Sequence, residues 1–230
     1  MKEFFCDSVF FGVLVSLVGY ELGLFLKKKT KSAICNPLLI SIIFVICLLL
    51  LLKVDYNSYN KGAKYLSYLL TPATVCLAVP LYRQINLLKE NVVAIIGGII
   101  SGVLTSAITV IIVSIIFNLN HKEYITLLPK SITTAIGMGV SEELGGIVTI
   151  TVAVIVVTGI AGNILAEFIC KLFRIKNPIA KGIGIGTASH AIGTAKAIEM
   201  GEIEGAMSGL AIAVSGVITV VAASIFANII

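Results

Sequence analysis

Long apolar runs alternate with short basic or polar stretches along this chain of 230 residues. A run of about 20 apolar residues is long enough to cross a bilayer as a helix. The pattern predicts six such spans, over residues 9–26, 33–52, 65–82, 92–117, 145–168 and 206–230. Asn36 and Pro37 are a typical helix start for the second span, and a polar loop over 53–64 follows it. The third span should be kinked, because Pro72 and Pro80 each remove a backbone donor. The pattern is typical of an all-α polytopic membrane protein, a single integral membrane domain.

The stretch 181–201, KGIGIGTASHAIGTAKAIEMG, differs from the apolar runs around it. Each glycine inside a helix costs about 1 kcal/mol relative to alanine, and backbone freed from a helix within a membrane must face protein or water. The stretch therefore predicts a broken helix that lines a cavity. Its interrupting glycines and polar side chains are Gly182, Gly184, Gly186, Gly193, Thr187, Ser189, His190, Thr194 and Lys196.

Two basic clusters predict the topology. Lys27, Lys28, Lys29 and Lys31 follow the first span, and Lys171, Arg174, Lys176 and Lys181 follow the fifth. Both ends should be cytoplasmic by the positive-inside rule, with the N-terminus outside. The fourth span then ends outside and the fifth begins there, so residues 124–144 must enter and leave the membrane on one side. This segment is predicted to be a re-entrant hairpin with Pro129 in a first helical turn and a break at Gly137 and Gly139. By the same count, 181–201 is a hairpin from the cytoplasmic side.

The two predicted hairpins resemble each other in sequence. An offset of 56 (193 − 137) aligns Ala135-Ile136-Gly137 with Ala191-Ile192-Gly193, and six of the 13 positions from Ala135 to Ile147 are then identical. Each unit, 124–172 and 178–230, would be one hairpin plus one span, so the two should have opposite orientation. Inverted repeats with broken helices are typical of alternating-access carriers, here of an elevator type. The four-span part, 1–117, precedes them.

Two half-helix N-termini that converge from opposite sides would bind an anion, because each presents free amide donors and the positive end of a dipole. Small hydroxyl side chains, with Lys130 or Lys196, would add to such a site, and a small carboxylate is the ligand that fits. His190 could carry a coupling proton; the alternative is a packed histidine bonded to backbone. Glu143 is a second candidate for coupling. Glu199 is expected to form an ion pair, and Asn163 either reaches the site or bridges helices.

Composition limits the function classes. Hydrophobic residues make up 58% of the chain and charged residues 13%, and the net charge of +5 comes from clusters between apolar runs, which predicts no nucleic-acid partner. The five cysteines are scattered, which predicts neither a disulfide framework nor a metal site. No nucleophile and base, phosphate loop or cofactor motif indicates an enzyme. The cysteines are Cys6, Cys35, Cys47, Cys76 and Cys170.

Four segments resemble the LrgB/CidB family of bacterial membrane proteins in order and spacing, over nearly the whole chain. They are LLTPATVCLAVPLYRQ from Leu69, LLPKSITTAIGMGV from Leu127, NPIAKGIGIGTASHAIGTAKAIE from Asn177 and EGAMSGLAIAVSGVIT from Glu204. Two features depart from the family's pattern: Ala135 stands where some members have proline, and the run Ser141-Glu142-Glu143 is unusually acidic.

The resemblance implies a multi-pass protein of the bacterial plasma membrane, made with a small holin-like partner of the LrgA/CidA type. The family is historically assigned to control of murein hydrolase release and autolysis; a plastid relative carries glycolate and glycerate, and bacterial pairs have been linked to pyruvate. Three functions remain open: a carrier of small monocarboxylates, an antiholin-like or holin-like regulator, and a scaffold. A homodimer is a further expectation. The resemblance implies these site positions: Pro129, Lys130, Ser131, Thr133, Thr134, Thr187, Ser189, His190, Gly193 and Thr194.

Overall fold

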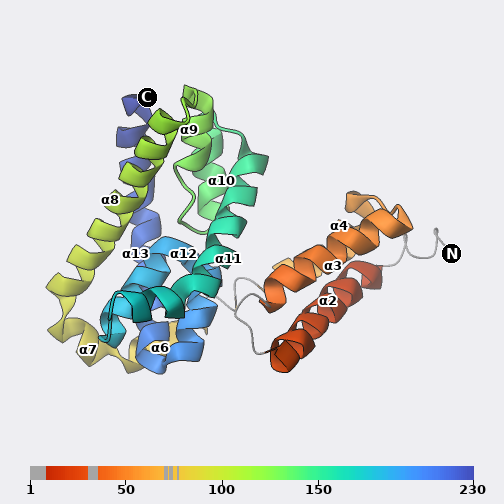
Figure 1. Cartoon of the computed structure of the whole chain (residues 1–230), viewed down its shortest axis with the longest axis horizontal. Coiled ribbons are helices and arrows are strands. Elements are labelled where there is room, and N and C mark those ends of the chain that lie inside the picture. Colours follow the sequence, from red (N-terminus) through yellow and green to blue (C-terminus); the bar gives the residue numbers. More distant parts are fainter. Residues whose placement is uncertain (1–8, 31–35, 70–71, 73–74, 77) are drawn as a thin grey trace. The chain divides into compact units, whose positions relative to one another are not determined.

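The regular elements of the structure, a computed structural model, are helices throughout the residues that it describes, which are 9–30, 36–69, 72, 75–76 and 78–230 (Figure 1). The expectations for Cys6, Lys31 and Cys35 lie outside these residues. The chain forms two compact units, residues 1–76 and 77–230. Division into a single domain with a four-span part ending at residue 117 stays a prediction; α8, which ends at Ile116, packs within the second unit.

The first unit contains three helices, α2 (Val9–Thr30), α3 (Pro37–Leu52) and α4 (Tyr56–Ser67). The predicted start of α3 is confirmed, because Asn36 caps it by accepting from Leu38 N at 2.9 Å and Pro37 is its first residue. The predicted loop over 53–64 is wrong in that α4 covers most of it. Asp55 caps α4, and the hydroxyl of Tyr59 lies 2.7 Å from Ser16 Oγ on α2. The polar residues of α4 suggested a loop, but contact with α2 stabilises this segment as a helix.

Within the described residues, the second unit contains four long helices, α8, α11, α12 and α13, and four short ones, α6, α7, α9 and α10. The predicted third span, 65–82, is not one continuous helix in its described residues. Its first residues belong to α4, which ends at Ser67, and its last ones to α6, which begins at Ala78. The helices are α6 (Ala78–Arg83), α7 (Ile85–Glu90), α8 (Val92–Ile116), α9 (His121–Leu127), α10 (Thr134–Glu143), α11 (Val148–Leu172), α12 (Pro178–Met200) and α13 (Glu202–Phe226), with a 3-10 turn at Ala227–Ile229.

Within the described residues, four helices are long and apolar enough to cross a membrane: Phe10–Thr30, Val92–Ile116, Val148–Leu172 and Glu202–Ile229. On α8, Ile95, Ile99 and Val103 are buried in a stripe of four-residue spacing, whereas Leu104 and Ile108 on the opposite face are exposed. A helix whose exposed face is as apolar as its buried face is suited to lipid rather than water. The protein is therefore a membrane protein. The number of six spans stays a prediction, since α3, one of the predicted spans, has only 16 residues, fewer than the four helices named above.

Both predicted hairpins fold back on themselves. Thr126 of α9 and Ser141 of α10 both bond to Thr151 of α11. Within α12, Ile185 and Ala197 lie in one buried cluster, although twelve residues of straight helix would separate them by about 18 Å. The helix turns sharply at His190, whose φ is 42° and ψ is −142°. We name residues 121–143 the first hairpin and residues 178–200 the second hairpin.

The two hairpins begin at opposite ends of α13. Lys181 of the second hairpin pairs with Glu204 in the first turn of α13 at 3.6 Å. Tyr124 of the first hairpin donates to the carbonyl of Phe226, where α13 ends, at 2.7 Å. Figure 1 shows α9 beside the C-terminus at one end of this unit, with α6 and α7 at the other. The hairpins therefore enter the unit from opposite ends; their origin as inverted repeats stays a prediction.

The predicted position of the break in the first hairpin is wrong. The helix is interrupted at Leu128–Thr133, whereas Gly137 and Gly139 lie inside α10. In the second hairpin too, the break falls at His190 and the glycines remain helical. Gly137 serves close packing instead: a Cβ there would collide with the end of the Ile155 side chain. With the offset of 56, His190, where the second hairpin turns, aligns with Thr134, the residue that starts α10 directly after the first break.

Candidate functional site

The tips of the two hairpins meet on consecutive turns of α8. Ser131, in the first tip, lies with its hydroxyl 2.9 Å from Ser106 Oγ. One turn earlier, a Cβ on Gly102 would lie 2.7 Å from Thr187 Oγ1 of the second hairpin. Positions 102 and 106 share one helix face because they are four residues apart. The face of α8 is therefore in contact with both hairpins, and glycine at 102 is what lets Thr187 approach.

The tips also meet on α11, at Ile155. This residue is fully buried, and its side chain packs over Gly137 of the first hairpin. Its carbonyl oxygen lies 2.9 Å from His190 Nε2 of the second hairpin. Two membrane-length helices thus hold both tips, α8 near its middle and α11 within its first half, which matches the predicted meeting of the two broken helices.

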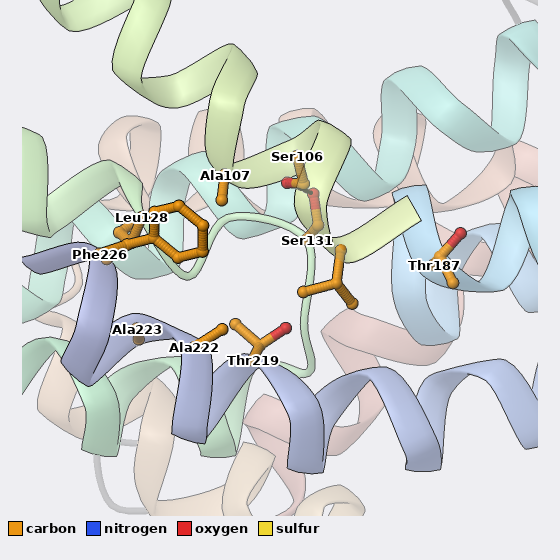
Figure 2. A pocket seen from close by; sticks show the side chains of 10 residues that line it. Ser106, Ala107, Leu128, Ser131, Thr187, Thr219, Ala222, Ala223 and Phe226 are labelled. Atoms are coloured by element: carbon orange, nitrogen blue, oxygen red, sulfur yellow. Dashed lines mark hydrogen bonds between the residues drawn. The ribbon is translucent and has the colours of Figure 1, made fainter. Parts of the chain in front are cut away.

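A small cavity lies between the tips (Figure 2). In Figure 2, Ser106 and Ser131 lie together above the cavity, Thr219 of α13 lies below it, and Thr187 lies to the right. Its volume is about 10 Å³, which is enough for about one water molecule. Six of its ten lining residues are apolar and four carry hydroxyls. In this conformation it is closed to any organic acid.

The first tip carries the only predicted cation beside this cavity. Lys130 is half-buried, and its Nζ donates to Ser131 Oγ at 3.1 Å. Thr133 is the N-cap of α10, but its hydroxyl makes no capping hydrogen bond. The first amides of α10 therefore lack the side-chain acceptor that an N-cap threonine usually supplies. Half-buried Thr133 and Thr134 thus lie at a helix N-terminus that can accept an anion.

The second tip is fixed by hydrogen bonds of its own. Thr194 Oγ1 donates to the carbonyl of His190 at 2.9 Å and lies 2.7 Å from Ser208 Oγ of α13. Asn163 of α11 donates to the carbonyl of Ile192 at 2.7 Å. Asn163 thus bridges helices, and it bonds to a carbonyl just after the break. His190 is packed and bonded to backbone, the alternative that the sequence had left open for it.

Small residues allow the second hairpin to lie close against its neighbours. A Cβ on Gly182 or on Gly186 would lie 2.5 Å from a backbone oxygen of α13, that of Glu204 or of Ser208. Gly162 of α11 lies directly against Ser189, and Gly193 packs inside the hairpin against the same serine. Ser189 and Gly193 therefore belong to the packing of the hairpin, on the side away from the cavity lining.

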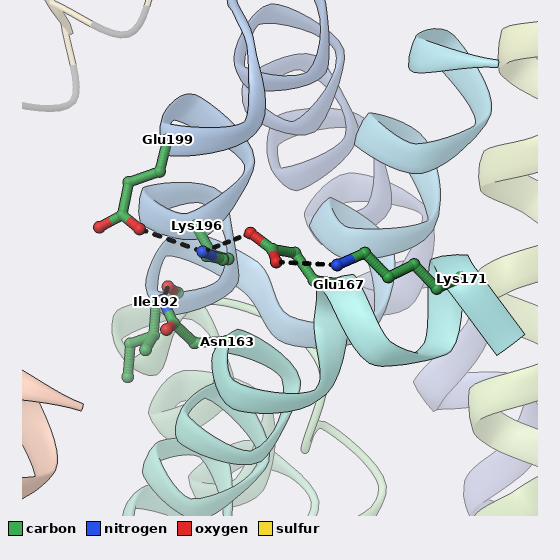
Figure 3. A network of polar contacts seen from close by, with 6 residues as sticks. All are labelled: Asn163, Glu167, Lys171, Ile192, Lys196 and Glu199. Carbon is green, nitrogen blue, oxygen red and sulfur yellow. Dashed lines mark hydrogen bonds and ion pairs between the residues drawn. The ribbon is translucent and has the colours of Figure 1, made fainter. Parts of the chain in front are cut away.

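Ion pairs join the end of the second hairpin to α11 (Figure 3). Lys196 Nζ lies 2.7 Å from Glu167 Oε1 and 3.2 Å from Glu199 Oε2, and Glu167 also lies 3.8 Å from Lys171. The predicted pairing of Glu199 is confirmed. Lys196 is held in this network, away from the cavity. Of the two lysines that the sequence offered for the site, Lys130 is therefore the one beside a cavity residue, Ser131. Glu143 is exposed at the end of α10, and its coupling role stays a prediction.

Several residues of this site were missed by the sequence reasoning. Ser106 sits in an apolar span, and only its four-residue spacing from Gly102 could have indicated that it shares a face with that glycine. Ser141 belongs to a buried hydroxyl network: Thr151 Oγ1 donates to Ser141 Oγ at 2.7 Å and lies 2.9 Å from the carbonyl of Thr126. The acidic run Ser141-Glu142-Glu143, which departs from the family's pattern, therefore has two roles. Ser141 holds the first hairpin on α11, and Glu142 and Glu143 are exposed.

Comparison with known proteins finds relatives along almost the whole sequence of this chain. The LrgB-like family matches residues 16–229. Proteins named antiholin-like protein LrgB from Bacillus cereus and from Bacillus anthracis are each 39% identical over 218 residues, covering 94% of this chain and 95% of theirs. No solved structure matches the chain. The match covers almost the full length of this chain and includes both hairpins. The chain therefore belongs to the LrgB-like family of membrane proteins.

Proposed function

We propose that this protein is a secondary carrier that moves small monocarboxylates, of the size of pyruvate, lactate or glycolate, across the bacterial plasma membrane. The observation that carries the proposal is the convergence of two broken helices, from opposite ends of one unit, on a cavity lined by Ser131, Thr187 and Ser106. Broken helices that meet at mid-membrane are the usual way in which carriers hold a substrate.

The chemistry of the first tip favours an anion. Lys130 beside Ser131 supplies a positive charge, and α10 begins there with its positive dipole end and an N-cap hydroxyl free of capping bonds. The cavity between the tips is itself small, so the substrate should be small. A carboxylate with one or two further oxygens would match these hydroxyl and amide donors.

The cavity volume of about 10 Å³ indicates an occluded conformation without room for substrate. Transport then requires one hairpin to move away from α8, opening the cavity to one face of the membrane at a time. Breaking the Ser106–Ser131 contact would open it past the first hairpin. Breaking the Lys196–Glu167 pair would release the end of the second hairpin from α11.

The names of the relatives favour a second function, an antiholin-like regulator of envelope permeability. In that case the chain would act on a small holin-like partner of the LrgA/CidA type, and through it on murein hydrolase release and autolysis. The two functions differ in one measurable respect: a carrier moves its substrate when it is the only protein in the membrane. Transport that requires the partner would join the two proposals.

The test is uptake of labelled pyruvate into proteoliposomes that contain this chain alone. We expect saturable uptake, and we expect Thr187→Val to reduce its rate about tenfold, because a lost hydrogen bond to a charged group contributes about 1.5–3 kcal/mol. Thr105→Val is a matched control. Thr187 Oγ1 donates to the carbonyl of Ile183, four residues before it, at 2.8 Å. Thr105 Oγ1 makes the same kind of bond to the carbonyl of Ser101, at 2.7 Å, but is exposed on the surface of α8. Its uptake should equal that of the wild type.

Two outcomes would contradict the carrier proposal. One is the absence of uptake for pyruvate, lactate and glycolate both with the chain alone and with the small partner. The other is equal loss in Thr187→Val and Thr105→Val, which would place the effect in helix stability rather than in the cavity. Circular dichroism of both variants in the same liposomes controls for folding.

A further inference from the structure

A second and larger pocket lies where α11 ends and α12 begins. It is open to the surface and has a volume of about 600 Å³, which is within the usual range of about 300–1,000 Å³ for ligand pockets. Its charged lining is mainly basic, and we call it the basic pocket. The charged residues that line it are Lys171, Arg174, Lys176, Lys181, Glu167 and Glu199.

The charges of the basic pocket do not cancel. Four basic and two acidic side chains leave a net charge of +2 (4 − 2). Lys196 and Glu204, one of each sign, lie beside it and leave this sum unchanged: Lys196 pairs with both lining glutamates, and Glu204 pairs with Lys181. In the part of the chain that the structure describes, Arg174 and Lys176 form no ion pair. They remain available to an anion from outside the chain.

The backbone that carries these two cations is well fixed. Arg174 has a φ of 55° and ends α11 in a left-handed turn, with Ile175 N donating to the carbonyl of Cys170 at 2.8 Å. This is a typical C-terminal helix motif. Three residues later Asn177 caps α12, accepting from Ile179 N at 2.8 Å. The cations therefore sit on a short connection that is anchored at both ends, which lowers the entropy lost when they bind a ligand.

The surroundings of the basic pocket indicate which anion would bind. Apolar side chains in the last turns of α11, Phe168, Leu172 and Phe173, are exposed by 61%, 60% and 69%. They lie at the end of a helix of membrane-crossing length, so that the pocket should sit at the depth of the lipid headgroups. A ligand with a phosphate at that depth and acyl chains beside α11 would contact both the cations and the exposed apolar side chains.

We propose that the basic pocket binds the phosphate of an anionic phospholipid. Basic pockets beside membrane helices suit such headgroups, and the net charge of +2 suits one headgroup with two phosphates or two with one each. Inorganic phosphate offers the same oxygens to Arg174 and Lys176 but no acyl chains for Leu172 or Phe173. The proposal does not depend on transport, because it concerns a different pocket from the cavity between the hairpin tips.

The experiment titrates the purified full-length chain in detergent with phosphatidylglycerol or phosphatidylcholine and counts bound lipids by native mass spectrometry. The wild type should prefer phosphatidylglycerol. The double variant Arg174→Gln/Lys176→Gln should bind it at least about 30-fold more weakly, because it removes two charge-assisted hydrogen bonds to the phosphate. Lys28→Gln/Lys29→Gln is the matched control: it removes the same charge from two exposed lysines at the end of α2, which do not line the pocket. Its binding should change less than about twofold, because charges outside the pocket act only through a screened long-range attraction.

Three results would overturn the proposal. The wild type could show no preference between the two lipids, or the control variant could lose as much affinity as the pocket variant. Inorganic phosphate at millimolar concentration could also displace the lipid completely and bind alone to the wild type but not to Arg174→Gln/Lys176→Gln. That last result would make the pocket a soluble phosphate site. Pyruvate uptake is measured separately, so a failed lipid test leaves the carrier proposal intact.

Discussion

Replacing Gly186 by alanine is expected to lower the free energy of unfolding by about 2 kcal/mol, as overpacking of a tight contact usually does. The added Cβ would lie 2.5 Å from the carbonyl oxygen of Ser208 and 2.8 Å from the Cβ of Ala211. Both obstacles belong to the backbone or the stem of α13, so no side chain can rotate away. The second hairpin must separate from α13, which would also strain the Thr194–Ser208 contact.

Gly184→Ala is the matched control for this prediction. Gly184 lies in the same arm of the second hairpin, two residues earlier, but a Cβ there would meet nothing within 4 Å. Alanine at this position should raise stability by up to about 1 kcal/mol through its helix propensity. Thermal unfolding of both variants in one detergent checks the pair. Equal midpoints would show that the close approach of α12 to α13 is absent from the folded protein.

Replacing His190 should reverse the usual order of alanine and glycine in a helix. His190→Ala is expected to cost about 2–4 kcal/mol, since it removes a buried side chain and its contact with the Ile155 carbonyl. Alanine would also have to keep the φ of 42°, a conformation that side chains other than glycine rarely adopt. His190→Gly loses the same contacts but tolerates this backbone, so it should be about 1 kcal/mol more stable than His190→Ala.

Ala195→Gly provides the reference for this comparison. Ala195 is exposed on the same helix, beyond the break, and glycine there should be about 1 kcal/mol less stable than alanine. Chemical denaturation of the wild type, His190→Ala, His190→Gly and Ala195→Gly gives the difference in unfolding free energy between alanine and glycine at each of the two positions. If His190→Gly is also less stable than His190→Ala, the backbone at residue 190 is helical and the second hairpin does not turn there.

The periodicity and polarity of the sequence predicted which segments break, but not where. Polar stretches inside apolar runs correctly indicated both hairpins, because broken backbone in a membrane needs polar surroundings. Glycine was taken as the residue that breaks the helix. In the structure Gly137, Gly182 and Gly186 stay helical, since their lack of a Cβ is used for contact with neighbouring helices. The breaks fall at Leu128–Thr133 and at His190, where tertiary contacts hold the turn.

The candidate site was predicted in part. Ser131 and Thr187 line the cavity as the predicted site requires, whereas Ser189 and Thr194 hold the second hairpin against α11 and α13. The sequence does not show which neighbour a hydroxyl side chain faces. Residues that line the cavity therefore cannot be told from residues that hold the hairpin against other helices. Ser106 of α8 was not found in this way, because its role depends on which segments pack against that helix.

Side-specific labelling of a cysteine at residue 131 tests the central claim most directly. Ser131→Cys, in a background where the five native cysteines are serine, is treated in oriented vesicles with a membrane-impermeant thiol reagent. If a small acid binds between the tips and the cavity opens to each face in turn, the cysteine will be labelled from both faces, and pyruvate will slow both reactions. Labelling from one face or from neither, at rates that pyruvate leaves unchanged, would contradict the account.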